Sequence, residues 1–339
     1  MHTKIKITQG ALLVNLGAPE NANERSVRRY LADYLKDRRI VNITPWLWLP
    51  FLHLFILPFR LKHLVKNYAA IEKNGEMPSR THGHALAQGT QKKLEQAGHS
   101  IRVLSAMTYG NPSIEAGLAV LKSEGIEHAL IIPLFPQYCA STTAAAFDRL
   151  APLMAKNKVF PKIKIINQYF AEPDYIAALT NSIEQSIACA QADDRVSCRD
   201  YLTDDKKLLF SFSGIRQLQA DGGDPYPRQC VQTAEAIAAK LNLSPCQWLI
   251  TYQPRFGRTE WIGPNTSETL KNLPAQGVKN LLVICPGFTT DCLETLEEID
   301  IENRAVFMEA GGASYNYIPC LNDQQGHVKL METLIMDNL

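Results

Sequence analysis

Short apolar runs recur along the chain, separated by longer stretches with helical periodicity. Seven of these runs predict strands, at residues 11–15, 101–107, 129–134, 162–166, 208–212, 248–252 and 280–285. Apolar strands that alternate with helices are typical of a parallel sheet whose two faces are both covered. The pattern therefore predicts an α/β protein.

The two sets of predicted strands have similar ends. In each set the first strand ends at small residues, in LLVNLGAP (12–19) and LLFSFSGI (208–215), and the third runs into a proline, Pro133 or Pro286. We therefore expect two similar α/β halves with a junction near 165–175, followed by a last helix over about 325–338.

Ligands of open α/β sheets bind beyond the carboxyl ends of the strands, so the segments that follow the strands are the candidate site. The six candidates are 15–19, 109–113, 135–141, 211–216, 253–261 and 286–298. Because the chain has neither a GxGxxG after its first strand nor a GxxxxGK[ST], no nucleotide cofactor is expected.

The most apolar stretch is 45–64, which contains Trp46, Trp48 and Phe55. Two prolines and a histidine interrupt it, so it falls short of the ~20 apolar residues of a membrane-spanning helix. Two interpretations stay open. The segment 46–59 is either a lip against a membrane interface or an apolar ligand, or part of a buried helix pair.

Composition and charge narrow the function. The 339 residues include 35 Lys+Arg and 34 Asp+Glu, a formal net charge of +1, which leaves no surplus charge for nucleic acid. The 8 cysteines contain no CxxC pair, which favours reduced thiols. The first ten residues have no signal-peptide pattern, so we expect a cytoplasmic protein.

An acidic stretch follows the last predicted strand. On an α-helix, Asp291, Glu294, Glu298 and Glu302 would form one stripe, and no lysine lies between Pro286 and Glu302. Such a row suits the passage of a hard cation or of protons. A solvated acidic face is the alternative.

Two other strand ends carry polar side chains. Ser211 and Ser213 lie on one side of their strand, but without a G-x-S-x-G pattern neither is identified as a nucleophile. Arg255 and Arg258 stand beside aromatic residues. They suit an anionic ligand with a flat apolar body, or they are structural ion-pair partners.

Several motifs together resemble the ferrochelatase family, whose members insert ferrous iron into protoporphyrin IX to make haem. They include LVNLGAP (13–19), RRYLADYLKDRRIV (28–41), LWLPFLHLFILP (47–58), YGNPSI (109–114), IPLFPQYCAST (132–142), GDPYPRQC (223–230), RFGRTEWIGP (255–264) and PGFTTDCLETLEEI (286–299). The resemblance implies two Rossmann-like, chelatase-like domains, each a parallel sheet flanked by helices, with a cleft between them. We place these domains at 1–168 and 169–324, with the helix over about 325–339 packing back on the first.

The resemblance also assigns roles. It implies that Glu294 is the metal-side carboxylate, that Glu298 is catalytic with it, and that Asp291 and Glu302 extend the relay. Ser213 stands where the family has its active-site histidine. The resemblance therefore assigns the catalytic and metal-binding role at that position to Ser213. The implied porphyrin-lining residues are Asn15, Trp48, Phe55, Tyr109, Tyr138, Arg255, Trp261 and Phe288.

The serine leaves three functions open, because its hydroxyl is neither a base near pH 7 nor a strong ligand for Fe²⁺. The chain is a ferrochelatase, weakened or not, a non-catalytic porphyrin- or haem-binding paralogue, or a chelatase for another metal or tetrapyrrole. The expected partners are protoporphyrin IX and Fe²⁺ as substrates, with peripheral membrane contact through 46–59. No iron–sulfur cluster is expected, since Cys189 and Cys198 supply only two ligands of the usual four.

Overall fold

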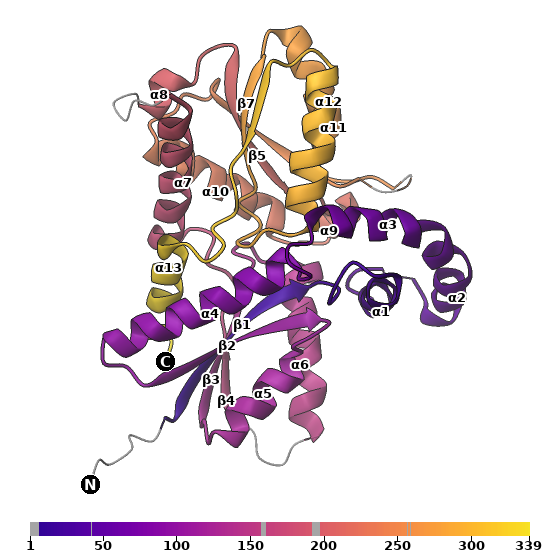
Figure 1. The fold of residues 1–339 in the computed structure, drawn as a ribbon, viewed down its shortest axis with the longest axis vertical. Helices are drawn as coiled ribbons and strands as arrows, with labels where there is room; N and C mark the ends of the chain where they lie inside the picture. The colour runs from indigo at the N-terminus through magenta and orange to yellow at the C-terminus, as the bar shows by residue number, and fades with distance from the viewer. Residues whose placement is uncertain (1–6, 42, 157–160, 192–196, 256, 258) are drawn as a thin grey trace. The chain divides into compact units, whose positions relative to one another are not determined.

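The computed structural model describes residues 7–41, 43–156, 161–191, 197–255, 257 and 259–339. Backbone contacts divide the chain into two units (Figure 1). Unit 1 comprises Met1–Phe135, Cys139–Asn167 and Asn322–Leu339, and unit 2 comprises Pro136–Tyr138 and Gln168–Leu321. Within the described residues each unit has a parallel sheet of four strands flanked by helices, which confirms the predicted fold class.

Unit 1 has the strand order β2-β1-β3-β4. Its strands are β1 (Gln9–Gly17), β2 (Ile101–Tyr109), β3 (His128–Pro133) and β4 (Lys162–Ile165). The long connection from β1 to β2 contains α1 (Glu24–Leu35), α2 (Pro45–Phe51), the π-helix η1 (Leu52–Ile56), α3 (Leu57–Ile71) and α4 (Pro78–Gln96). The other helices are α5 (Ile114–Ser123), the π-helix η2 (Ala140–Ala144), α6 (Ala145–Lys156) and the C-terminal α13 (Gln325–Met336).

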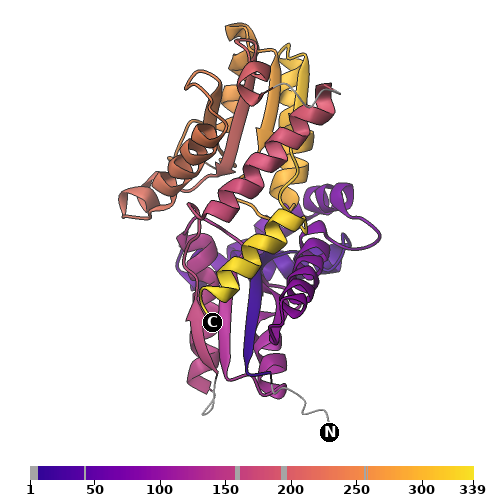
Figure 2. The same cartoon turned by 90° about the vertical axis from the view of Figure 1, so that its left-hand side faces the viewer.

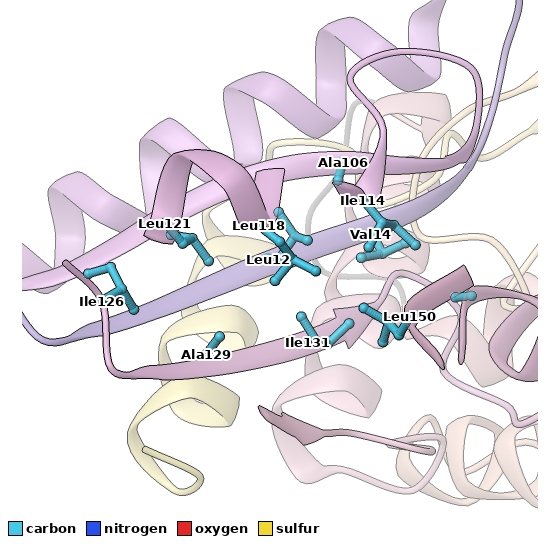
Figure 3. Packing of buried hydrophobic residues seen from close by; sticks show 11 residues of the cluster. Leu12, Val14, Ala106, Ile114, Leu118, Leu121, Ile126, Ala129, Ile131 and Leu150 are labelled. Atoms are coloured by element: carbon cyan, nitrogen blue, oxygen red, sulfur yellow. The ribbon is translucent and has the colours of Figure 1, made fainter. Parts of the chain in front are cut away.

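The core of unit 1 shows how the apolar pattern produces the sheet (Figure 3). Leu12 and Val14 are two residues apart on β1, so both side chains point to one face, where they join a buried cluster with Ile131 of β3 and Leu118 of α5. Burying each such side chain stabilises the fold by about 1.5–3 kcal/mol. Gly117 allows α5 to approach this face, because a Cβ there would lie 2.6 Å from Leu12 Cδ1.

The last segment of the chain closes unit 1. Helix α13 packs on α4, and Figure 2 shows the chain end beside the strands of the first sheet. The backbone oxygen of Leu339 accepts a hydrogen bond from Gln9 Nε2 at 2.9 Å, at the start of β1. His327 of α13 is fully buried, and this burial lowers its pKa to about 4, so the imidazole is neutral at pH 7.

Unit 2 has the strand order β6-β5-β7-β8. Its strands are β5 (Lys206–Ser213), β6 (Trp248–Gln253), β7 (Asn280–Ile284) and β8 (Ser314–Tyr317). Its helices are α7 (Pro173–Gln191), α8 (Cys198–Tyr201), α9 (Gln217–Asp221), α10 (Tyr226–Lys240), α11 (Thr266–Asn272), the 3-10 turn η3 (Leu273–Gln276), the π-helix η4 (Glu294–Asn303) and α12 (Arg304–Glu309). Leu209, Val283 and Phe307 belong to its core cluster.

Strand β8 was not predicted from the apolar pattern. Its sequence is Ser-Tyr-Asn-Tyr, and only Tyr315 and Tyr317 are buried. Pairing with β7 makes β8 the edge of the sheet, and an edge strand of four residues needs no continuous apolar run.

Candidate active site

The candidate site of unit 2 begins where β5 and β6 end. Ser213 and Gln253 are the last residues of these strands and lie in register. The backbone N–H of Gly214 donates to the backbone oxygen of Gln253 at 2.6 Å. A Cβ at Gly214 would lie 2.8 Å from the backbone oxygen of Pro254, so only glycine fits there without a shift. These contacts hold the half-buried Ser213 at the carboxyl edge of the sheet.

The acidic segment after β7 is a π-helix rather than the α-helix considered from the sequence. Residues of a π-helix bond to the residue five positions on, so the α-helical stripe is replaced by another arrangement, and single-turn π-bulges are frequent at functional sites. Helix η4 contains Glu294, Glu297 and Glu298 and begins after Asp291. Of the predicted row, Asp291 is buried and Glu302 is exposed, so the row is not a uniformly solvated face.

Glu298 has the most unusual environment of these carboxylates. Its Oε2 is buried and has no hydrogen-bond partner within the described residues. Burial raises the pKa of Glu298 well above its usual 4.5, and the charges of Glu294, Glu297 and Glu302 raise it further. Glu298 therefore holds a proton more tightly than an ordinary carboxyl group, and a divalent cation bound beside it would relieve the repulsion.

Asp291 is held by a separate set of contacts. Its Oδ1 accepts hydrogen bonds from Tyr317 Oη at 2.6 Å, Thr295 Oγ1 at 3.1 Å and the backbone N–H of Cys320 at 3.3 Å. Asp291 is not among the charges that raise the pKa of Glu298. Its visible role in unit 2 is to fasten the start of η4 to the segment after β8.

Two amide residues of the site were assigned no role from the sequence, although Gln253 begins the candidate segment 253–261. Gln253 Nε2 donates to the backbone oxygen of Glu294 at 3.3 Å, and Gln253 Oε1 accepts from Asn303 Nδ2 at 2.7 Å. Asn303 Nδ2 also donates to the backbone oxygen of Glu298 at 2.7 Å. The available signal was positional, because Gln253 ends its strand as Ser213 does. Asn303 carried no signal, since it lies beyond the acidic motif.

Three other predicted residues lie in unit 2, and one of these, Trp261, is in contact with the segment after β5. The backbone of Trp261 bridges to Arg216, and its ring lies 3.4 Å from the Cβ position of Gly214. Phe288 packs against the core cluster after β7. The backbone N–H of Tyr138 donates to Gln229 Oε1 at 2.7 Å.

Arg255 and Arg258 were predicted with two alternatives. Arg255 is exposed and forms an ion pair with Glu268 at 3.4 Å. Exposed pairs of this kind contribute only about 0–1 kcal/mol to stability, so the Arg255 guanidinium can leave Glu268 and pair with another carboxylate at little cost. Arg258 lies outside the described residues.

Two of the predicted residues lie on strands of unit 1, Asn15 near the end of β1 and Tyr109 at the end of β2. Asn15 is buried, and its Oδ1 accepts from the backbone N–H of Leu16 at 2.8 Å. Tyr109 is fully buried and donates to Asp37 Oδ2 at 2.9 Å. Burial raises the pKa of Tyr109, and the neighbouring Asp37 charge adds to this effect. The Arg149 guanidinium lies 4.9 Å from the centre of its ring.

The apolar segment, residues 46–59, is largely exposed. Trp46 is 73% and Phe59 81% exposed, and Phe55 is 52% exposed. Trp48 is half-buried and donates from Nε1 to the backbone oxygen of Leu35 at 2.7 Å. Among the described residues, no helix is both long and apolar enough to cross a membrane.

The described residues contain no group of three His, Cys, Asp or Glu side chains placed to enclose a metal ion. All eight cysteines lie among the described residues as free thiols, and five of them are buried.

Among the solved structures similar to this chain are a chelatase and a protein that resembles chelatases. The sirohydrochlorin chelatase SirB from Bacillus subtilis subspecies spizizenii, in complex with cobalt, aligns with a TM-score of 0.53 and 10% identity over 98% of this chain and 95% of that one. DR2241 from Deinococcus radiodurans, a multi-domain protein with structural similarity to chelatases, gives 0.54 and 9% over 97% of this chain and 55% of that one. At such low identity the likeness shows the fold alone, which is the chelatase fold.

The sequence defines the family within that fold. Residues 8–339 match the family model described as Ferrochelatase. The chain is 41% identical over 327 residues to the ferrochelatase of Vibrio atlanticus, covering 96% of this chain and 97% of that protein. It is 42% identical over 330 residues to ferrochelatase 1 of Shewanella oneidensis, covering 97% and 95%. The chain belongs to the ferrochelatase family.

Proposed function

We propose that the protein inserts Fe²⁺ into protoporphyrin IX, the terminal step of haem synthesis. The observation that carries this proposal is the acidic π-helix beside the ends of β5 and β6, in a chain that matches ferrochelatases over nearly its whole length. The metal is a substrate, so an open row of carboxylates suits it better than a closed ligand set.

Glu294, at the start of η4, is the proposed metal-side carboxylate. Metallation replaces the two pyrrole protons of the macrocycle with Fe²⁺, and these protons need an acceptor. Glu298 suits this role because burial and neighbouring charges raise its pKa. Glu302 is exposed and provides the step from Glu298 to solvent. Asp291 belongs to this set as the anchor of the helix.

Ser213 is proposed as the residue that faces a pyrrole nitrogen or the entering metal. Its hydroxyl can donate and accept hydrogen bonds but does not titrate near pH 7. Removing a positioned acid–base group typically lowers a rate by about 10²–10⁴-fold, so activity supported by the carboxylates would persist at a lower level. Ser213 also favours the second candidate function, a porphyrin-binding paralogue without turnover.

The proposed porphyrin contacts are the residues named from the family motifs. Trp261, Phe288 and Tyr138 supply apolar or aromatic surface in unit 2, and Arg255 supplies a cation for a carboxylate side chain of the porphyrin. Asn15, Trp48 and Phe55 are the proposed contacts in unit 1. Tyr109 was named with them from the family motifs, but because it is fully buried we propose that it acts through its hydrogen bond to Asp37.

We also propose peripheral membrane contact through the apolar segment in a cytoplasmic protein. The exposed side chains of Trp46 and Phe59 support it, since exposed aromatic residues suit the interfacial region of a bilayer. Arg60 and Lys62 follow directly and would favour anionic lipid.

An anaerobic metallation assay with purified protein, protoporphyrin IX and Fe²⁺ tests the function. Loss of porphyrin fluorescence with the appearance of the haem spectrum is the expected result. Saturable porphyrin binding without turnover would select the binding paralogue. Turnover with cobalt or nickel but not with iron would select a chelatase for another metal.

A further inference from the structure

The side chains of Gln253 and Asn303 form a bridge between the sheet and the acidic π-helix. Gln253 ends β6 in register with Ser213, and its backbone oxygen accepts from the N–H of Gly214 at 2.6 Å. The position of Gln253 relative to Ser213 is therefore set by the sheet. Its side chain extends from there to the helix, through Asn303 Nδ2 at 2.7 Å.

The bridge ends on the backbone of the two glutamates with proposed roles in metallation. Gln253 Nε2 donates to the backbone oxygen of Glu294 at 3.3 Å. Asn303 Nδ2 donates to the backbone oxygen of Glu298 at 2.7 Å. Both hydrogens of Asn303 Nδ2 are thus used. A reversed amide would place Oδ1 against two other acceptors, so the orientation follows from the network.

The bridge is buried, and two polar atoms at it have no hydrogen-bond partner within the described residues. Gln253 and Asn303 are each 7% exposed. Asn303 Oδ1 and Glu298 Oε2 are both buried with no hydrogen-bond partner within the described residues. A buried unpaired acceptor lowers stability, and such groups in a native structure call for an explanation.

We propose that Gln253 and Asn303 are positioning residues for the metal carboxylates. They fix the backbone of Glu294 and Glu298 relative to the strand end that carries Ser213, so that the carboxylates keep one separation from it. This role rests on the proposed function, because it concerns the same metal site. Residues that orient metal ligands typically change metal affinity or activity by about 10–100-fold when they are replaced.

Asn303→Ala and Gln253→Ala test the role in the full-length protein. Each should weaken binding of Co²⁺, titrated alone by its absorption spectrum, by about 10–100-fold and lower kcat for metallation by a similar factor. KM for protoporphyrin should change little, because the amides are not among the proposed porphyrin contacts. The double variant should lose little more than either single variant, since both changes break one bridge.

Gln247→Ala is the matched control. Gln247 is also a buried glutamine, lies directly before β6, and donates to the backbone oxygens of Arg199 and Leu202. It should lower the melting temperature as much as the test variants do but leave Co²⁺ affinity and kcat unchanged. Equal losses in all three variants would overturn the positioning role in favour of a general stability effect.

An exchange of the two amides keeps the test valid if the alanine variants fail to fold. Gln253→Asn shortens one side chain by a methylene, and Asn303→Gln lengthens the other by the same amount. Each single change should weaken Co²⁺ binding, and the combined variant should recover part of the loss. No recovery, or wild-type affinity in the single variants, would overturn the role.

The two proposals fail in different ways. A wild-type protein that binds Co²⁺ but does not metallate protoporphyrin would contradict the proposed function, and the Co²⁺ comparison would still decide the positioning role. If Glu294→Gln bound Co²⁺ as the wild type does, there would be no carboxylate site to position, and the positioning role would be wrong.

Discussion

Units 1 and 2 use the same scaffold with different chemistry at the same place. In both, the sheet has its first strand at the second position and its third strand beside it, and a π-helix follows that third strand. The π-helix of unit 1, Ala140–Ala144, has the neutral sequence ASTTA, whereas that of unit 2, Glu294–Asn303, reads ETLEEIDIEN. The duplicated fold thus supplies an irregular helix after the third strand of each sheet, and only the copy in unit 2 carries carboxylates on it.

The connection between the first two strands also differs. Unit 2 joins β5 to β6 through the short α9 and through α10. Unit 1 joins β1 to β2 through the equivalent long helix α4, preceded by α1 and by α2, η1 and α3, which carry the apolar segment. Unit 1 therefore has the exposed apolar surface and unit 2 the acidic site.

Glu294→Gln should reduce metallation by about 10²–10⁴-fold, because it removes charge from the acidic helix and keeps the side-chain volume. The melting temperature should stay unchanged or rise as repulsion with Glu298 decreases. The matched control is Asp148→Asn in α6, a half-exposed carboxylate after the π-helix of unit 1, paired with Arg39 at 2.7 Å. It should leave the rate of haem formation unchanged. Equal loss in both variants would break the division between the units.

Acid should affect the two units in opposite directions. The pKa of His327 in unit 1 is about 4 in the folded protein and 6.5 in the unfolded chain. The free energy of unfolding is therefore at its full value above pH 6.5 and decreases as the pH falls toward 4, because the unfolded chain binds the proton first. The loss at pH 5 is about 2 kcal/mol. The pKa of Glu298 in unit 2 is raised above 4.5, so acidification through that pKa relieves a cost.

Hydrogen exchange at pH 7 and pH 5, corrected for the intrinsic exchange rate, measures this difference. Protection of α13 should decrease, while protection of β5 should hold or increase. His327→Gln should remove the pH dependence of α13. Parallel losses of protection in both units would contradict the prediction.

Ser213→His should raise ferrochelatase activity by about tenfold or more. Imidazole would supply a base that titrates near pH 6.5 and a nitrogen ligand for Fe²⁺. The pH profile of kcat should gain a step near that value. If the wild type is already as fast as the variant, the carboxylates of η4 carry the proton transfer unaided. If neither turns over but both bind porphyrin, the binding paralogue is the better description.

Phe55→Ser should weaken binding to anionic liposomes or to protoporphyrin several-fold and change the melting temperature by only a few degrees, because the side chain is half exposed. Trp48→Ser should cost more stability, since it also removes the hydrogen bond to Leu35. Leu52→Ala, at a fully buried position of the same segment, should cost about 2–5 kcal/mol. Liposome sedimentation and thermal unfolding separate these effects. Equal destabilisation by Phe55→Ser and Leu52→Ala would place the whole segment in the core.

Most strands could be predicted because a strand that is buried on both faces is apolar at nearly every consecutive residue. Leu12 and Val14, or Leu209 and Val283, are apolar wherever the sheet is covered. Strand β8 was not predicted because its two buried tyrosines alternate with polar residues and leave no apolar run. The π-helix was not predicted because i, i+3 and i+4 spacings assume α-helical hydrogen bonds. The charges of the segment do not determine whether its backbone forms α-helical or π-helical hydrogen bonds.

The amino-acid sequence by itself determined the α/β class, the duplication, the family and the acidic motif, since all of these depend on residues close together in the chain or on motifs shared with relatives. Tertiary structure alone decided the contacts of Gln253 with Glu294 and with Asn303, which lie 41 and 50 positions further on. It also decided that Tyr109 is buried against Asp37, 72 positions away, while Phe59 is exposed. The physical reason is that hydrogen-bond partners and burial at a strand end depend on which distant segments the sheet brings beside it, and local periodicity carries no record of them.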